Sequence, residues 1–126
     1  MKSMCILIVV SLLFLSLGIG LTLWMHKDVD ILIGYAMDMK EAAEKEDEEG
    51  IERAIDQFSE LWNHREHSWE FFCNHNDLND VTISFIQIRH SFAQREYEYI
   101  ELESSLLILS LQNIHEKEIP RIENII

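Results

Sequence analysis

Two hydrophobic patterns follow one another along the chain. Residues 6–25 form an uncharged apolar run, ILIVVSLLFLSLGIGLTLWM. At about 1.5 Å per helical residue, this run reaches roughly 30 Å, the thickness of a bilayer core. From residue 28 onward the apolar residues recur every three or four positions, the spacing of amphipathic helices. The pattern predicts an all-α protein: a transmembrane helix followed by a small antiparallel bundle of about four helices, built as two helical hairpins.

Four helices are predicted after the apolar run, and turn-forming residues suggest their ends. Their expected ranges are about 28–47, 51–73, 77–95 and 97–118, and the first can continue directly out of the membrane helix. Gly50 is expected to cap the C-terminus of the first helix. Asp77, with Asp80 three residues later, resembles a capping box that opens the third. Pro120 is expected to stop the fourth, and the apolar tail 121–126 to pack back onto the bundle.

Each predicted helix carries an apolar stripe that is expected to form the core. In the first two helices the stripes consist of Val29, Leu32, Ala36, Met39 and Ala43, and of Ile51, Ile55, Phe58, Trp62, Trp69 and Phe72. In the last two they consist of Leu78, Val81, Phe85, Ile88 and Phe92, and of Leu102, Leu106, Leu109 and Ile114, with Leu107 and Leu111 broadening the face. Arg65 falls on the second stripe, so its charged end is expected to reach solvent at the edge.

The stripes are weakly self-similar. The residues Ile51, Ala54, Phe58 and Leu61 match Tyr99, Leu102, Leu106 and Leu109 at an offset of 48 positions. Stacked hairpins of the solenoid kind give such repeats, and so does any set of four amphipathic helices. A compact antiparallel bundle is preferred, because short connections favour antiparallel neighbours.

The apolar run is interpreted as a retained anchor rather than a cleaved signal peptide. Two small-x-small patterns, one ending at Gly18 and one at Gly20, have the spacing of a signal-peptide cleavage site. The apolar run nevertheless continues past both, through Trp24 and Met25. Trp24 also suits the headgroup level of a membrane. The chain is therefore divided into a short tail (1–5), an anchor (6–25) and an acidic helical domain (26–126).

The orientation signal is weak, because only Lys2 and Lys27 closely flank the run. A very short N-terminal tail usually stays in the cytoplasm, so the domain of this single-pass protein is expected outside the cytoplasmic membrane. The only two thiols, Cys5 and Cys73, then lie on opposite sides, and no disulfide can join them. Cys73 is interpreted as a small buried hydrophobic residue.

Charge restricts the partners. The chain has a net charge of −13, and residues 28–126 hold all 23 acidic and 8 of the 10 basic residues, a net charge of −15 (8 − 23). Nucleic-acid binding is excluded, because phosphate contacts need a basic patch. Binding along an anionic lipid surface is disfavoured for the same reason. The acidic surface is interpreted as a solvated face, with docking to a basic partner or loose cation binding as alternatives.

The most suggestive chemical cluster is a metal-binding candidate. His64 and His67 are three residues apart and Glu60 lies one turn earlier, so two imidazoles and a carboxylate share a helix face. The spacing differs from the His-Glu-x-x-His metalloprotease pattern, and such a pair is usually polar surface. No catalytic residue, cofactor or firm metal ligand is predicted, and the protein is not expected to be an enzyme.

Two further sets of residues have a structural and a functional interpretation. Trp62 and Trp69 are seven residues apart on one face, which is typical of a core, although tryptophan also dominates partner-binding hot spots. They are the partner-binding candidates of the sequence. His75 sits at a predicted turn, where its ring can bond to carbonyls at a helix end.

Several soft motifs point to a known family. They are an N-terminal apolar segment, Ala54 shortly after an acidic helical turn, Trp62, Trp69, the turn His75-Asn76-Asp77-Leu78, and the ending Glu123-Asn124-Ile125-Ile126. In these features the chain resembles a domain-of-unknown-function family of short, single-span, membrane-anchored helical proteins from Gram-positive spore-forming bacteria. The resemblance implies an anchored helical domain without established activity or catalytic residues, and a membrane protein as partner.

The sequence therefore predicts a membrane-anchored, non-enzymatic interaction module or accessory subunit of another membrane protein, with homo-oligomers as a further option. The alternative is an extracytoplasmic ligand- or metal-sensing domain that uses His64 and His67. The two differ in a simple way, because added metal should stabilise only the sensing domain.

Overall fold

The computed structural model describes residues 2–70 and 73–125, with the side chains of residues 21, 22, 24–26 and 116–125 left out. The described residues form helices and no strand, which confirms the all-α class. The helices are α1 (Lys2–Glu44), α2 (Glu48–Trp69), α3 (His75–Ala93) and α4 (Tyr97–Ile125).

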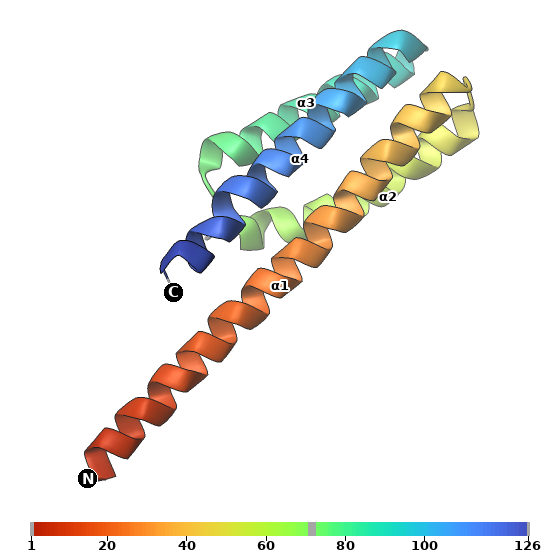
Figure 1. The fold of residues 1–126 in the computed structure, drawn as a ribbon. Helices are drawn as coiled ribbons and strands as arrows, with labels where there is room; N and C mark the ends of the chain where they lie inside the picture. Colours follow the sequence, from red (N-terminus) through yellow and green to blue (C-terminus); the bar gives the residue numbers. More distant parts are fainter. Residues whose placement is uncertain (1, 71–72, 126) are drawn as a thin grey trace.

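Helix α1 joins the apolar run and the first amphipathic stripe in one uninterrupted helix of 43 residues, about 65 Å long. The predicted N-terminal tail is part of this helix, which begins at Lys2. Its first part, Lys2–Gly20, is long and apolar enough to cross a membrane, and none of this stretch is buried in the protein. Figure 1 shows it extending away from the other helices.

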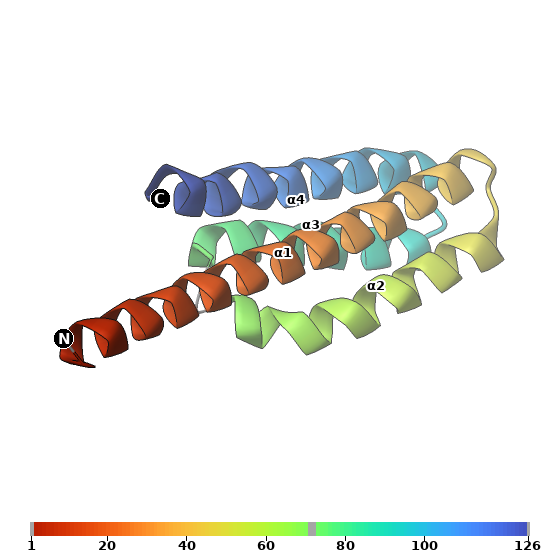
Figure 2. The ribbon, with the colours of Figure 1, turned by 60° about the horizontal axis from the view of Figure 1, so that its bottom comes forward.

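The second part of α1 packs along both α2 and α4, and α4 packs along α3 (Figure 2). Helices α2 and α3 have few close backbone approaches and meet through large side chains. The rings of Phe58 and Phe85 stack there with centroids 4.7 Å apart, and Trp62 lies edge-on to Trp69 at 5.6 Å. Aromatic volume therefore fills the wider side of the bundle.

The first turn of the bundle differs from the prediction. Glu46, with a φ of 54°, takes the left-handed position that ends α1, and the Asp47 N–H donates to the Ala42 carbonyl at 2.9 Å. Gly50 is therefore not a C-terminal cap, because it lies in the first turn of α2. Its N–H donates to Asp47 Oδ1 at 3.2 Å, so Asp47 is the N-cap of α2. A Cβ at Gly50 would come within 2.5 Å of Asp47 Oδ2.

Two other predicted helix ends are wrong. Helix α3 begins at His75 with Asn74 as its N-cap, whose Oδ1 accepts from the Asn76 N–H at 3.0 Å, so Asp77 lies inside the first turn. Helix α4 continues through Pro120 to Ile125, so Pro120 does not stop it, and the packing of the side chains of the tail lies outside the described residues. Proline removes one intrahelical hydrogen bond at this position, and the helix nevertheless continues for five residues beyond it.

The two hairpins, α1–α2 and α3–α4, repeat each other at an offset of 49 positions, not 48. The left-handed residues Glu46 and Arg95 are 49 apart (95 − 46), and every backbone hydrogen bond of the first turn recurs in the second at this offset. Buried positions follow the same offset: Val29/Leu78, Leu32/Val81, Ala36/Phe85, Met39/Ile88, Ile51/Ile100, Ile55/Ser104, Phe58/Leu107 and Trp62/Leu111.

The corrected offset explains which core prediction failed. The stripes predicted on α1, α2 and α3 are buried where the structure describes them, except that Phe92 is only partly buried and Phe72 lies outside the described residues. On α4 the predicted residues Leu107, Leu111 and Ile114 are buried, and Ile100 and Ser104 complete the core side. Leu102, Leu106 and Leu109 are exposed, so their predicted place in the core is wrong.

Candidate functional surfaces

The predicted metal-binding cluster lies on the solvent face of α2. His64, His67 and Glu60 are all exposed, and His67 Nδ1 is 3.6 Å from Glu70 Oε2. Among the residues that the structure describes, no three His, Cys, Asp or Glu side chains come together as a metal site would require. The helix therefore places the two imidazoles on one face without bringing a further ligand to them.

The two tryptophans predicted as core or partner contacts are buried in the bundle. Trp62 also lies 6.3 Å, centroid to centroid, from Phe58. A buried side chain cannot reach a partner unless the bundle opens. The structure therefore supports the core interpretation of Trp62 and Trp69 and corrects their use as partner-binding candidates.

Cys73 and His75 are the remaining candidates from the sequence. Cys73 is buried, as the sequence predicts for a small hydrophobic residue. His75 is exposed and is the first residue of α3, so it lies at the turn between α2 and α3 as the sequence predicts.

A buried ion pair that the sequence did not reveal marks the point where the apolar helix enters the bundle. The Asp28 side chain is almost fully buried, and its Oδ2 lies 3.0 Å from Nε of Arg65, whose side chain is one-third exposed. The contact has ion-pair distance but lacks hydrogen-bond geometry. Close by along the same helix, Asp30 Oδ1 is 3.9 Å from His115 Nε2. These contacts hold the base of α1 against α2 and α4.

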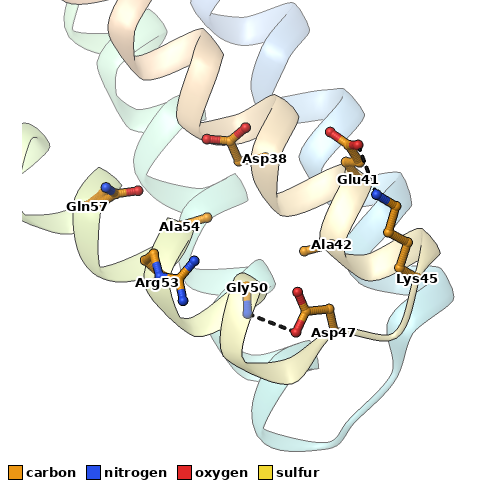
Figure 3. A pocket seen from close by; sticks show the side chains of 9 residues that line it. All are labelled: Asp38, Glu41, Ala42, Lys45, Asp47, Gly50, Arg53, Ala54 and Gln57. Carbon is orange, nitrogen blue, oxygen red and sulfur yellow. Dashed lines mark hydrogen bonds and ion pairs between the residues drawn. The ribbon is translucent and has the colours of Figure 1, made fainter.

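A shallow groove of about 310 Å³ lies between the end of α1 and the start of α2 (Figure 3). Asp38, Glu41 and Lys45 line it from α1, and Arg53 and Gln57 from α2. Lys45 Nζ is 3.2 Å from Glu41 Oε1, and both side chains are well exposed. The groove is open, and its charges are solvated, so it lacks the apolar enclosure that small-molecule sites usually have.

At the end of the bundle far from the apolar helix, one carboxylate joins the two hairpin turns. Glu48 Oε1 accepts a hydrogen bond from the Tyr97 hydroxyl at 2.9 Å and is 3.2 Å from Arg95 Nη1. This hydrogen bond raises the pKa of the Tyr97 phenol above its ordinary value of 10.0, because it favours the neutral donor, and nearby negative charge adds to the effect.

The outer face of α4 is a surface that sequence reasoning missed. Tyr99, Leu102, Leu106 and Leu109 are exposed along three turns of one helix face. The signal was present in the sequence, because α4 carries two apolar stripes and one helix cannot bury both against its two neighbours, α1 and α3. The serine at 104 made the true core stripe look less apolar than the exposed one.

Fold and surfaces together define an all-α protein with one N-terminal helix apolar enough to cross a membrane and a helical bundle of undefined chemistry. Residues 23–125 match the family described as "Domain of unknown function (DUF4363)", and the chain belongs to this family. The resemblance to a domain-of-unknown-function family is confirmed to that extent. No curated protein and no solved structure matches the chain.

Proposed function

We propose that the protein is a membrane-anchored, non-enzymatic interaction module that serves as an accessory subunit of another membrane protein. The observation that carries this proposal is the wholly unburied apolar stretch Lys2–Gly20 at the start of α1. So large an apolar surface needs a cover, and a bilayer of matching thickness supplies one.

The continuity of α1 supports an anchor over a cleaved leader. The candidate cleavage positions at Gly18 and Gly20 lie inside an unbroken helix, and Asp28 and Val29 of the same helix are already buried in the core. The helix that crosses the membrane is then also a core helix of the antiparallel bundle. Such a helix fixes the domain at the membrane surface and presents the rest of its surface to a neighbour.

We place the bundle outside the cytoplasmic membrane, with the N-terminus inside. A single-cysteine test decides the side: Asn63→Cys, at an exposed position of α2, in a chain with Cys5→Ser and Cys73→Ser. A membrane-impermeant maleimide should label this variant in intact cells. A chain that is labelled only after lysis has its domain in the cytoplasm, and one that leaves the membrane on alkaline extraction is not anchored.

The accessory role is tested by crosslinking the full-length, C-terminally tagged protein in its native membrane and identifying what co-purifies. One stoichiometric membrane protein is the expected result. Recovery of self-crosslinked species alone contradicts the accessory role. The metal-sensing alternative is not carried forward, because no described residue completes a site around His64 and His67.

A further inference from the structure

The exposed residues on the outer face of α4 form a regular seam. Tyr99, Leu102, Leu106 and Leu109, here called the α4 seam, are 58%, 55%, 42% and 55% exposed. They are spaced by three, four and three residues, which is the a/d spacing by which one helix packs against another in a coiled coil. Asn113 continues the spacing and is also exposed.

The fold itself does not require apolar residues at these positions. The corresponding positions in the first hairpin, 49 residues earlier, are Gly50, Arg53, Gln57 and Glu60. Arg53, Gln57 and Glu60 are exposed as well, so both hairpins leave this face to solvent. The first hairpin folds with a polar outer face, and the leucines of α4 are therefore not explained by the packing of the bundle.

Lipid does not cover the α4 seam either. His115 of α4 lies beside Asp30 of α1, and Tyr97 bonds to Glu48 at the far end, so the seam runs along the distal part of the bundle. At 1.5 Å per residue, Leu109 lies roughly 25 Å beyond Gly20 along the helix axis. The seam is therefore outside the bilayer that Lys2–Gly20 would span.

The flanks of the seam are acidic. Glu98 is exposed beside it, and Glu103 lies on the other side, half-buried. Oε2 of Glu103 is buried and has no hydrogen-bond partner among the described residues. A carboxylate oxygen of this kind is best satisfied by a cationic donor. None of the described side chains of α4 is Lys or Arg, so the described part of this helix presents no base beside the seam.

A second copy of the chain fits poorly. Two copies anchored in one membrane would pair their α4 helices in parallel, because both domains point the same way. In a parallel coiled coil, a residue at position g of one helix faces position e of the next heptad in its partner. Glu98 occupies g and Glu103 occupies e of the seam, so Glu98 of each copy would face Glu103 of the other. Like charges at these positions disfavour the pair.

We propose that the α4 seam binds an amphipathic helix of a partner protein, with an apolar a/d stripe and Lys or Arg on both flanks. The inference rests on the proposed function and specifies the surface and chemistry of that interaction. Leucines of the partner would pack between the seam residues, and its basic flanks would meet Glu98 and Glu103.

The chain itself supplies the test variant. Leu102→Arg, Leu106→Gln and Leu109→Glu copy the residues of the first hairpin and leave the net charge unchanged. The control, Ile83→Arg with Ile86→Glu, removes exposed isoleucines from α3 and is also charge-neutral. Both variants should fold with thermal midpoints within a few degrees of the parent, because exposed substitutions cost little.

The probes are two synthetic helices of about three heptads with leucine at a and d, carrying lysine or glutamate at e and g. The lysine peptide should bind the full-length protein in detergent and the α3 control equally, and the seam variant at least about tenfold more weakly. The glutamate peptide should not bind. Equal binding of the lysine peptide to the seam variant would mean attraction to general acidity only, and absent binding to the parent would likewise overturn the proposal.

A photocrosslinking residue at position 106, with position 86 as control, extends the test to the native membrane. Adducts between two copies at 106 would make the seam a self-association surface and overturn the proposal. If the tagged seam variant still captures the same membrane protein as the parent, the accessory role stands and this inference falls. If the parent captures none while the lysine peptide discriminates, the accessory role falls and the seam remains a helix-binding surface.

Discussion

At residues 45–47 and again at 94–96, the two hairpins turn with the same hydrogen bonds and the same left-handed residue. From these turns outward, buried positions coincide at an offset of 49. The residues at those positions nevertheless differ in size. Ala36 of α1 corresponds to Phe85 of α3, and Phe58 of α2 to Leu107 of α4.

The difference in size has a visible consequence for packing. Helix α1 approaches α4 closely, whereas the corresponding pair, α3 and α2, stands apart with aromatic rings between them (Figure 2). The distance between helices depends on the side chains at their contact, so small residues permit the first approach and Phe58 and Phe85 prevent the second. The shared backbone plan therefore fixes which positions are buried, and the side chains decide how the helices fit and what the outer faces present.

The largest expected effect concerns the aromatic side of the bundle. Phe58→Ala should destabilise the protein by about 4 kcal/mol, and its counterpart Leu107→Ala by about 3 kcal/mol. Phe58 should cost more, because it stacks on Phe85 where α2 and α3 have few other contacts. Denaturant unfolding of both variants measures the difference. A smaller loss for Phe58 than for Leu107 would contradict an aromatic junction between α2 and α3.

The next effect concerns the base of the bundle, where Arg65 corresponds to Ile114 in the second hairpin. Arg65→Ile leaves the Asp28 carboxylate buried without its ion partner and should cost about 2 kcal/mol, less than a fully buried pair because Arg65 is partly exposed.

The double variant Asp28→Leu, Arg65→Ile serves as the control, because it removes both charges together. It should recover most of the loss, since an apolar pair of similar volume replaces a buried ion pair at little cost. A double variant as unstable as Arg65→Ile alone would show that the charge of Asp28 is not the source of the loss.

A smaller effect on stability is expected from the residues that precede α2 and α4. Asp47 caps α2, whereas the corresponding residue before α4 is Glu96, a poor capping residue. Asp47→Ala should cost about 1 kcal/mol in thermal unfolding, and Glu96→Ala a few tenths at most. Equal losses would mean that the Asp47 carboxylate acts through the charge of the turn and not through the Gly50 N–H.

Three of the core stripes could be predicted from sequence because each of those helices has one dominant apolar face, although α3 also exposes Ile83 and Ile86. Helix α4 has two, and the choice between them depends on the register of the second hairpin relative to the first. The turns set that register, and neither has glycine at its left-handed position, since Glu46 and Arg95 stand there. The C-terminal cap is predicted at Gly50, because glycine favours the left-handed conformation. In the structure, the small size of Gly50 instead allows the Asp47 carboxylate to approach closely.

Of the candidate sites, only those that rest on one helix could be judged from spacing. His64, His67 and Glu60 are all exposed on α2, but spacing along one helix cannot show whether three side chains converge on one point, and among the described residues these three do not. The same limit hid the pair Asp28 and Arg65, which lie 37 positions apart (65 − 28) and meet only because α1 and α2 are antiparallel neighbours.

The smallest effect lies at the far tip, where Glu48 and Tyr97, corresponding first residues of α2 and α4, bond to each other. The neutral hydroxyl is the donor, so folding raises the Tyr97 pKa above 10.0. The contact therefore contributes fully below about pH 10 and is lost as the pH rises through the raised pKa. Tyr97→Phe should lower the thermal midpoint slightly at pH 8, and the difference from the parent should shrink as the pH rises through the raised pKa. Tyr99→Phe, at an exposed position two residues on, is the control and should show no such convergence. A Tyr97→Phe difference that shows no decrease at any pH above 10 would show that its ring packing, and not the bond between the two hairpins, carries the effect.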